Sequence, residues 1–381
     1  MVKPKTTKIL FAGGGTGGHF YPIIAIAEKI HTVAMNERIA NIALFFMSDN
    51  PIDKELLERM HVTYVEIKTG KRRTYASFQN FLDVFKTAFA CMKALWKIFL
   101  IYPDVIFGKG GYASFPALFA ARVLRIPVVI HESDISPGRV NRWVADYAEK
   151  IAISYPEALE HFPNKDRVAL TGQPIRASLL EIPQGDPLRI FGLEQDVPLI
   201  LVMGGSQGAE NINENLIDIM SKLVEHYQVI HQVGNANIEW MKKRAEDALR
   251  ENPNAHRYHP VAFIEPAELR IAAKGAALII SRAGSTIFEI AHWGLPSILI
   301  PLGIARDDHQ RQNAYSYART GAAIVLEEQN LKPEIFFTTI DSLMNDEERR
   351  TRMALATKTF AKDDAAEKIA KALLVIATKH V

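Results

Sequence analysis

The sequence contains a single cysteine, Cys91, among 381 residues. One cysteine excludes an internal disulfide framework and a cysteine-based zinc site, and it is typical of a chain kept in a reducing cytoplasm. Net charge is also small, because 45 Lys and Arg residues are balanced by 43 Asp and Glu residues, which leaves a formal charge of +2. A large nucleic-acid-binding surface is therefore not expected, and we predict no nucleic-acid partner.

The sequence also lacks long uninterrupted apolar runs. Its beginning passes from charged residues directly into a glycine turn, without the apolar core or cleavage site of a signal peptide. Residues 81–102 are strongly apolar but contain four charges, Asp83, Lys86, Lys93 and Lys97. A helix crossing the bilayer would bury those charges, so we predict that this segment does not span a membrane.

What the sequence does contain is an alternation of short apolar runs and helical segments that occurs twice. KILFAG, ALFFM, DVIFG and PVVIHE are typical of buried parallel strands, and PLILVMGG, QVIHQVG, AALIIS and PSILIP repeat the pattern after about residue 172. We predict an α/β protein of two doubly wound, Rossmann-like domains, 1–172 and 173–359. A last helix, within 360–381, is expected to pack back on the N-terminal domain.

Each half begins with a strand, a glycine-rich turn and a helix. Five of the six residues from Gly13 to Gly18 are glycine, and His19 follows. The second turn, MGGSQGAEN, contains Ser206, Gln207 and Gly208. Glycines let the backbone approach a pyrophosphate, and a helix N-terminus offers unpaired N–H groups and partial positive charge. Two such turns suit one diphosphate ligand held by both domains.

Several alternatives stay open on these residues alone. Gly13, Gly15 and Gly18 fit G-x-G-x-x-G, and Asp49 follows the next predicted strand, so an NAD-dependent oxidoreductase is one alternative. It leaves the second turn and SRAGSTIFE unexplained. In SRAGSTIFE, Glu289 can accept hydrogen bonds from two ribose hydroxyls or only stabilise the helix dipole. The polar run DDHQRQNA can contact sugar hydroxyls or form a solvated face.

Six segments together resemble the MurG family, the N-acetylglucosaminyltransferases of peptidoglycan synthesis. They are GGGTGGHFYP, HESDISPGRVNRWVA, TGQPIR, GGSQGAENIN, SRAGSTIFE and DDHQRQNA, and they occur in the family's order and rough spacing from about Lys8 to Leu326. The resemblance implies a GT-B fold, in which two doubly wound domains face a cleft. It also implies transfer of N-acetylglucosamine from UDP-N-acetylglucosamine to the 4-hydroxyl of the muramoyl sugar of lipid I, the undecaprenyl-diphosphate-linked muramoylpentapeptide. The products would be lipid II, with inverted configuration, and UDP. A glycolipid glycosyltransferase or a UDP-sugar epimerase of the same fold is the alternative.

The resemblance places the donor site mainly in the C-terminal domain. There the backbone of Ile264 would contact uracil, Glu289 the ribose, and Gln310 the N-acetylglucosamine. The residues expected near the phosphates are Ser206, Gln207, Gly208, Ser285, Thr286 and Arg176. From the N-terminal domain, Thr16, Gly17 and Gly18 would complete the donor site and approach the acceptor's diphosphate.

Two positions depart from the family pattern. Asp134 stands where the family usually has asparagine, and an ionised aspartate cannot donate a hydrogen bond to a sugar. SRAGSTIFE is one residue shorter than the family's motif, so the helix start near Ser285 and Thr286 is expected to shift.

The implied reaction needs a base that activates the acceptor hydroxyl. His19 is the first choice, because imidazole titrates nearest the working pH, although it could also only bind phosphate or cap the helix. Glu132 and Asp134 are alternative bases. The helix dipoles, backbone N–H groups and Arg176 could stabilise the leaving UDP. The chain has no Asp-x-Asp triplet, since Asp307 and Asp308 are adjacent, so we expect no required metal and at most weak Mg²⁺ binding.

A lipid-linked acceptor stays in the membrane. The basic cluster Lys71, Arg72 and Arg73 precedes a segment rich in aromatic and leucine side chains: Phe81, Leu82, Phe85, Phe89, Leu95, Trp96, Phe99 and Leu100. This composition suits an anionic membrane interface, and also a helix that buries one face on a sheet. Both can hold, because apolar residues occur on all sides of the helix. We predict a cytoplasmic protein bound peripherally to the inner face of the cell membrane.

Overall fold

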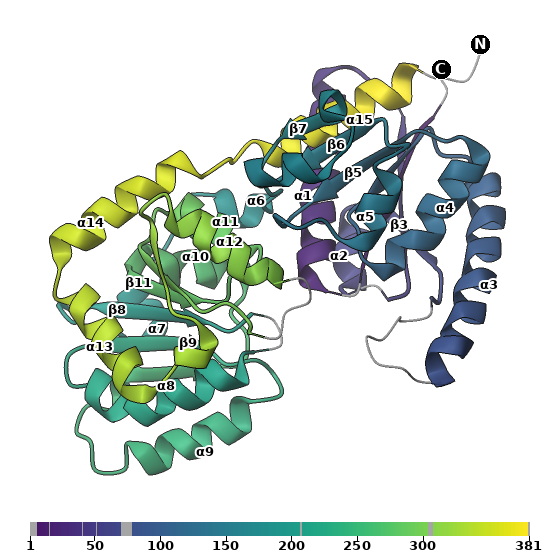
Figure 1. The fold of residues 1–381 in the computed structure, drawn as a ribbon. Helices are drawn as coiled ribbons and strands as arrows, with labels where there is room; N and C mark the ends of the chain where they lie inside the picture. The colour runs from purple at the N-terminus through teal and green to yellow at the C-terminus, as the bar shows by residue number, and fades with distance from the viewer. Residues whose placement is uncertain are drawn as a thin grey trace. The chain divides into compact units, whose positions relative to one another are not determined.

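The computed structural model describes residues 6–14, 16–39, 41–50, 52–69, 78–205, 208–303 and 308–379, with the side chains of residues 78–84 left out. The chain divides into two compact units (Figure 1). Unit 1 consists of residues 1–177 and 362–381, and unit 2 of residues 178–361. Each unit contains one parallel sheet, so the predicted α/β class with two doubly wound domains is confirmed.

Unit 1 contains a seven-stranded parallel sheet in the order β3-β2-β1-β4-β5-β6-β7. Its strands are β1 (Thr7–Ala12), β2 (Ile42–Ser48), β3 (Val62–Glu66), β4 (Val105–Gly108), β5 (Val128–Glu132), β6 (Lys150–Ile153) and β7 (Val168–Leu170). Its helices are α1 (Gly17–Asn36), α2 (Lys54–Arg59), α3 (Phe78–Ile101), α4 (Phe115–Leu124), α5 (Arg139–Val144) and α15 (Ala365–Lys379). The central strands are buried along their whole length because helices cover both faces of the sheet.

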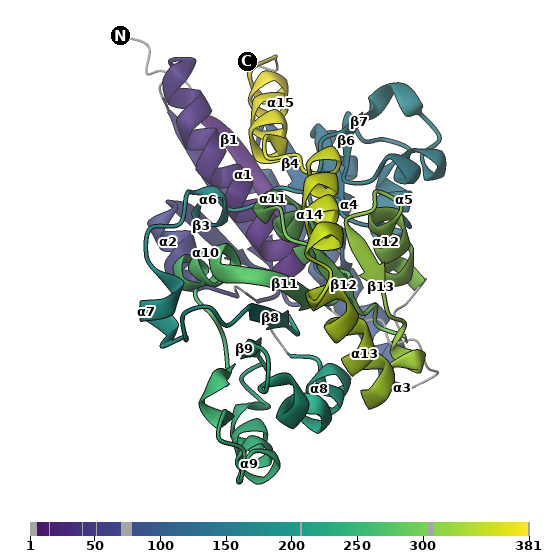
Figure 2. The same ribbon diagram turned by 90° about the vertical axis from the view of Figure 1, so that its left-hand side faces the viewer.

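The C-terminal helix α15 packs on α1, as predicted (Figure 2). Ile369 and Leu373 of α15 share one core with Ile23 and Ile26 of α1. This explains why α1 is buried without interruption from Pro22 to Ala27, where a surface helix would alternate apolar and polar faces. The last helix therefore completes the core of the unit in which the chain begins.

Unit 2 contains a six-stranded parallel sheet in the order β10-β9-β8-β11-β12-β13. Its strands are β8 (Leu199–Met203), β9 (Gln228–Gln232), β10 (Tyr258–Val261), β11 (Ala276–Ser281), β12 (Ser297–Leu299) and β13 (Ala323–Val325). Its helices are α7 (Pro187–Phe191), α8 (Glu210–Leu223), α9 (Ile238–Ala248), α10 (Pro266–Gly275), α11 (Thr286–Trp293), α12 (His309–Ala318), α13 (Pro333–Met344) and α14 (Glu347–Ala356). The short helix α6 (Ala177–Leu180) joins the two units.

Candidate active site

The glycine turn of unit 1 connects β1 to α1 at the carboxyl edge of the sheet. Gly14 has a φ of +144°, and a Cβ atom at this position would lie 2.1 Å from Ser48 Oγ. A Cβ on Gly13 would lie 2.9 Å from the side chain of Ile23. Thr16, the N-cap of α1, makes no side-chain capping bond, and the first turn carries no acidic residue. The N-terminus of α1 at Gly17 and Gly18 thus keeps the positive end of the helix dipole that favours an anion.

His19 lies in the first turn of α1 and is half-buried. Its Nδ1 atom is 3.1 Å from Thr16 Oγ1. A Cβ on Gly111, in the loop after β4, would lie 3.4 Å from His19 Cε1. The imidazole therefore lies between the loops that follow two adjacent strands, β1 and β4, which is where parallel sheets bind ligands.

Glu132, the last residue of β5, is buried and accepts three hydrogen bonds. Its Oε1 accepts from the backbone N–H of Asp134 at 3.1 Å, and its Oε2 accepts from the N–H of Gly138 at 3.0 Å and from Asn141 Nδ2 at 2.8 Å. Burial and then the charge of Asp134 raise the pKa of Glu132, while the hydrogen bonds lower it. These bonds fold the loop from β5 to α5 around the carboxylate, which gives Glu132 a structural task besides the base role that remains a prediction.

Lys109, which the sequence analysis did not single out, follows β4 directly and is fully buried in the same region. Its Nζ donates to Ser133 Oγ, and Ser133 Oγ donates to Gln173 Oε1 at 3.0 Å. Burial lowers the pKa of Lys109 to about 8, whereas Glu132 and Asp134 raise it. A lysine between the strand VIFG and two glycines is the signal in the sequence that could have identified this residue.

Arg176 belongs to unit 1 and contacts α1. Its guanidinium carbon lies 3.9 Å from the centre of the Tyr21 ring, a cation–π contact. The backbone N–H of the next residue, Ala177, donates to Glu28 at 3.2 Å. Both contacts hold Arg176 beside the same helix whose N-terminus follows the glycine turn.

The glycine turn of unit 2 follows β8. Ser206 and Gln207 lie outside the described residues. Gly208 has a φ of +79°, and a Cβ there would lie 2.1 Å from the carbonyl oxygen of Val233. A Cβ on Gly204 would lie 2.7 Å from the backbone nitrogen of Ala209. Backbone atoms cannot move aside as a flexible side chain can, so this turn requires glycine.

Gln232, at the end of β9, joins this turn to the segment predicted to bind uracil. Its Nε2 donates to the carbonyl of Gly205 at 3.2 Å, and its Oε1 accepts from the N–H of Ile264 at 3.0 Å. The N–H of Ile264 is thus already used, so the predicted backbone contact with uracil would fall on its carbonyl. Sequence reasoning missed Gln232, because its two partners are distant along the chain.

Helix α11 begins at Thr286, with Ser285 as an N-cap that makes no side-chain capping bond. Glu289 lies in its first turn and is half-buried. Because the helix starts here, Ser285, Thr286 and Glu289 all lie near one helix N-terminus after β11, at the carboxyl edge of the second sheet. The arrangement agrees with a site for an anion next to a hydroxyl-bearing group.

The loop after β12 is held by three side chains, Gln310, Arg282 and Glu328. Gln310 Oε1 accepts from the N–H of Leu302 at 3.0 Å. Arg282 donates to Ile300 O at 3.2 Å and to Glu328 Oε1 at 2.5 Å, and Glu328 Oε2 accepts from Gly303 at 2.8 Å. Burial opposes ionisation of Glu328, but these bonds keep its pKa low. Arg282 and Glu328 are further residues that the sequence analysis missed. Asp307 lies outside the described residues.

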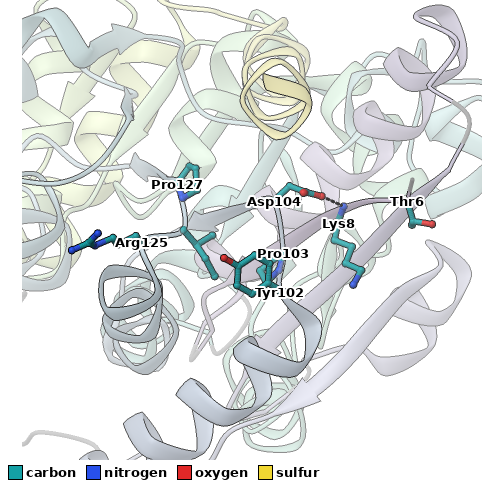
Figure 3. A pocket seen from close by; sticks show the side chains of 8 residues that line it. Thr6, Lys8, Tyr102, Pro103, Asp104, Arg125 and Pro127 are labelled. Carbon is teal, nitrogen blue, oxygen red and sulfur yellow. Dashed lines mark hydrogen bonds between the residues drawn. The ribbon is translucent and has the colours of Figure 1, made fainter. Parts of the chain in front are cut away.

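A cavity in unit 1 lies at the opposite, amino edge of the sheet (Figure 3). Its lining includes Lys8, Tyr102, Asp104 and Arg125, and none of the predicted site residues. Lys8 Nζ donates to the carbonyl of Ile101 at 2.7 Å, and the Lys8 N–H donates to Asp104 at 2.8 Å. These bonds tie the end of α3 to β1. Among the described residues, no three His, Cys, Asp or Glu side chains gather as metal ligands would.

Comparisons with known proteins match both units. The glycosyltransferase family 28 N-terminal domain matches residues 9–153, and the C-terminal domain of that family matches residues 199–369. A Treponema denticola protein named UDP-N-acetylglucosamine–N-acetylmuramyl-(pentapeptide) pyrophosphoryl-undecaprenol N-acetylglucosamine transferase is 34% identical over 95% of this chain and 96% of its own length. A Bacillus subtilis protein of the same name is 32% identical over 95% of this chain and 97% of its own.

Solved structures agree with these relatives. The crystal structure of Acinetobacter baumannii MurG aligns with a TM-score of 0.72 at 26% identity, covering 97% of this chain and 99% of the other. A UDP complex of Staphylococcus aureus MnaA has a TM-score of 0.71 at 14% identity, which establishes a shared fold alone. The fold is GT-B, as predicted, and the oxidoreductase alternative finds no support among these relatives. On the extent and identity of these matches, the chain belongs to the MurG family of N-acetylglucosaminyltransferases.

Proposed function

We propose that this protein transfers N-acetylglucosamine from UDP-N-acetylglucosamine to the muramoyl 4-hydroxyl of lipid I, and releases lipid II and UDP. The observation that carries the proposal is the 34% identity over 95% of the chain to a transferase of that name. It is supported by the motif residues, which follow the carboxyl ends of strands in both sheets. The UDP-sugar epimerase alternative rests on solved structures named UDP-N-acetylglucosamine 2-epimerase at 13–16% identity, which carry the fold only.

In the proposed reaction, His19 removes the proton from the acceptor hydroxyl as that oxygen attacks the anomeric carbon. The bond to the β-phosphate oxygen breaks at the same time, and UDP leaves on the opposite face. The contact of Nδ1 with Thr16 Oγ1 holds the imidazole at the start of α1, next to the glycine turn. His19 is preferred to Glu132, because the Glu132 carboxylate already accepts three hydrogen bonds.

Unit 2 binds the donor in this proposal. The carbonyl of Ile264 contacts uracil, Glu289 the ribose hydroxyls, and Gln310 the sugar. The turn at 204–208 and the N-terminus of α11, with Ser285 and Thr286, hold the diphosphate. Arg176 adds positive charge from unit 1. These N–H groups and the guanidinium stabilise the charge on the departing UDP, so no metal is required and Mg²⁺ binds weakly at most.

Transfer of labelled N-acetylglucosamine to a short-chain lipid I analogue tests the proposed function. We expect a labelled disaccharide product with UDP-N-acetylglucosamine as donor and no product with UDP-galactose. The rate in EDTA should equal the rate in Mg²⁺, because protein groups alone offset the charge. Free UDP with no labelled lipid product, or a 2-epimerised sugar, would contradict the proposal.

We further propose that α3 holds the protein on the membrane that contains the acceptor. Exposed apolar side chains form one stripe along this helix: Phe85, Phe89, Met92, Trp96 and Phe99, which are 56–71% exposed. Their spacing of three and four residues places them on one face. The opposite face, with Ala90, Ala94 and Ile98, is buried in the core of unit 1. Packing in the core and the proposed contact with the membrane therefore use opposite faces of α3.

The charges of the segment support an interfacial rather than a spanning position. Lys86 and Lys93 are exposed beside the apolar stripe, where they would meet anionic headgroups. No helix among the described residues is long and apolar enough to cross a bilayer. The basic cluster Lys71, Arg72 and Arg73 and the side chains of Phe81 and Leu82 lie outside the described residues. In this proposal the protein is peripheral on the cytoplasmic face of the cell membrane.

The double substitution Phe89→Asp and Trp96→Asp should release the protein from anionic vesicles. Each buried aromatic ring contributes roughly 1.5–3 kcal/mol, so we expect at least a tenfold loss of partitioning. Co-sedimentation with liposomes measures it. Met35→Asp, at a residue of α1 that is 74% exposed, is the matched control and should partition like the wild type. Equal partitioning of the double variant would contradict the membrane role of α3.

A further inference from the structure

The carbonyl group of Val233, which follows β9, supports the glycine turn of unit 2 at Gly208. A Cβ atom on Gly208 would lie 2.1 Å from this carbonyl oxygen, so the backbone of the turn packs directly against it. The turn also meets β9 beside Val233, because the N–H of Gly204 donates to the carbonyl of Gln232 at 3.3 Å. The end of β9 is therefore the surface on which this turn rests.

Two side-chain amides hold the Val233 carbonyl in place. Asn213, in the first turn of α8, donates from Nδ2 to the carbonyl oxygen at 3.1 Å. Asn237, the N-cap of α9, donates from its own Nδ2 to the same oxygen at 2.9 Å. A carbonyl oxygen has two lone pairs, and these two donors use both. The position of the oxygen is thus fixed by the helices that follow β8 and β9.

Asn213 is itself held by a chain of hydrogen bonds that reaches β10. Its Oδ1 lies 3.1 Å from Nε2 of His231, and Nδ1 of His231 lies 2.9 Å from the hydroxyl oxygen of Tyr258. All three side chains are buried. Buried polar groups are costly to leave without partners, so each member of this chain constrains the next.

The hydrogen bonds of this chain can run in one direction only. The Val233 oxygen can only accept, so the Asn213 amide must turn its NH₂ group to that oxygen and its own oxygen to the His231 ring. Nε2 of His231 must then carry the proton, and Nδ1 accepts from the Tyr258 hydroxyl. Burial lowers the pKa of His231 to about 3, so the ring is neutral and carries a single N–H, as this direction requires.

We propose that Asn213 is a positioning residue for binding of the donor diphosphate, because its amide fixes the Val233 carbonyl on which the turn at Gly208 rests. His231 and Tyr258 keep that amide in the orientation that this task requires. The inference rests on the proposed function for its ligand, UDP. Asn213 acts on the ligand only through the turn, and the chain of hydrogen bonds can be observed without any ligand.

NMR of the histidine ring nitrogens tests the direction of the chain. At neutral pH we expect His231 to be neutral with its proton on Nε2, and we expect Tyr258→Phe to shift the Nδ1 resonance, because that atom loses its donor. The ring is assigned by its loss in His231→Gln, or by through-bond correlation to its backbone if that variant does not fold. A proton on Nδ1, or an Nδ1 resonance that Tyr258→Phe leaves in place, would overturn the chain.

The variant Asn213→Leu tests the effect on the turn, because leucine has nearly the shape of asparagine but no polar atoms. We expect the affinity for UDP, measured by calorimetry, to fall by roughly tenfold or more, since the carbonyl under the turn loses one of its two donors. The N–H of Gly208 donates to the carbonyl of Gly205 at 3.1 Å. Hydrogen exchange of this amide should become faster by roughly tenfold as well.

Gln228→Met is the matched control. Gln228 is also a buried amide, but it lies at the opposite end of β9, where its Nε2 donates to the carbonyls of Glu194 and Val197 at 3.0 and 2.6 Å. We expect this variant to lower the melting temperature about as much as Asn213→Leu and to keep UDP affinity within about threefold of the wild type. An equal loss of affinity in both variants would mean that Asn213 acts through stability alone, and would overturn the positioning role.

The outcomes separate this inference from the proposed function. A wild-type protein that binds UDP but transfers no sugar would contradict the proposed function, while calorimetry still decides the role of Asn213. A transferring enzyme in which Asn213→Leu keeps the wild-type affinity for UDP would overturn the inference. If Asn213→Leu does not fold, Asn213→Asp takes its place with the same expected loss, because it keeps the acceptor for His231 and removes the donor to Val233.

Discussion

Replacing His19 by alanine is expected to slow transfer of N-acetylglucosamine by roughly 10²–10⁴-fold, the usual contribution of a positioned general base. The loss should appear in kcat, because in the proposed function the donor is bound mainly by unit 2. Pre-steady-state transfer to the lipid I analogue measures the chemical step, and calorimetry measures donor affinity.

His31→Ala is the matched control for this variant. His31 lies on the same helix, and its Nε2 atom is 3.1 Å from the carbonyl of Met60, so its loss affects local packing of α1 without reaching the glycine turn. We expect His31→Ala to keep at least about a third of the rate. If His19→Ala retains the wild-type kcat, the base must be sought at Asp134 or Glu132.

Gly208→Ala should strongly weaken donor binding by deforming the turn that follows β8. The added Cβ would lie 2.1 Å from the carbonyl oxygen of Val233, a backbone atom, and the residue would also keep a left-handed φ of +79°. The left-handed conformation costs about 1–2 kcal/mol and overpacking about 1–3 kcal/mol. If the UDP-bound form is destabilised by about 3 kcal/mol more than the free form, affinity for UDP decreases by roughly 100-fold.

Gly192→Ala separates the two contributions. Gly192 has a φ of +65°, but nothing lies within 4 Å of the position of its Cβ, so this substitution carries the backbone cost without the collision. It should lower the melting temperature slightly and leave UDP affinity within about threefold of the wild type. Calorimetric titration with UDP compares the variants, and equal affinities for Gly208→Ala and the wild type would contradict a phosphate cradle at this turn.

Strands that are buried on both faces can be predicted from the sequence, because each forms a continuous apolar run in its own residues. The eight apolar runs singled out coincide, to within two residues at either end, with β1, β2, β4, β5, β8, β9, β11 and β12. Strands near the sheet edges were not predicted, because they contain no continuous apolar run. The sequence of β10 is YHPV, and β7 is three residues long and mostly exposed. Such strands are stabilised by pairing with a neighbour, which their own residues do not encode.

The same distinction applies to the site. Glycine turns and helix starts are visible as motifs, so Thr16, Gly208 and Ser285 could be selected from the sequence. Gln232 and Arg282 could not, because their importance comes from partners far along the chain, such as Glu328 for Arg282. The motifs identify groups that would touch a ligand, while the side chains that hold those groups in place emerge only from the fold.

The position of α15 has a consequence for how the molecule is made. A ribosome releases the first strands of unit 1 early, yet Ile369 and Leu373, which cover α1, are synthesised only after the whole of unit 2. Until they emerge, the apolar outer side of α1 stays uncovered and open to chaperones or to misassociation. The half of the enzyme that is translated first is therefore the half that finishes folding last.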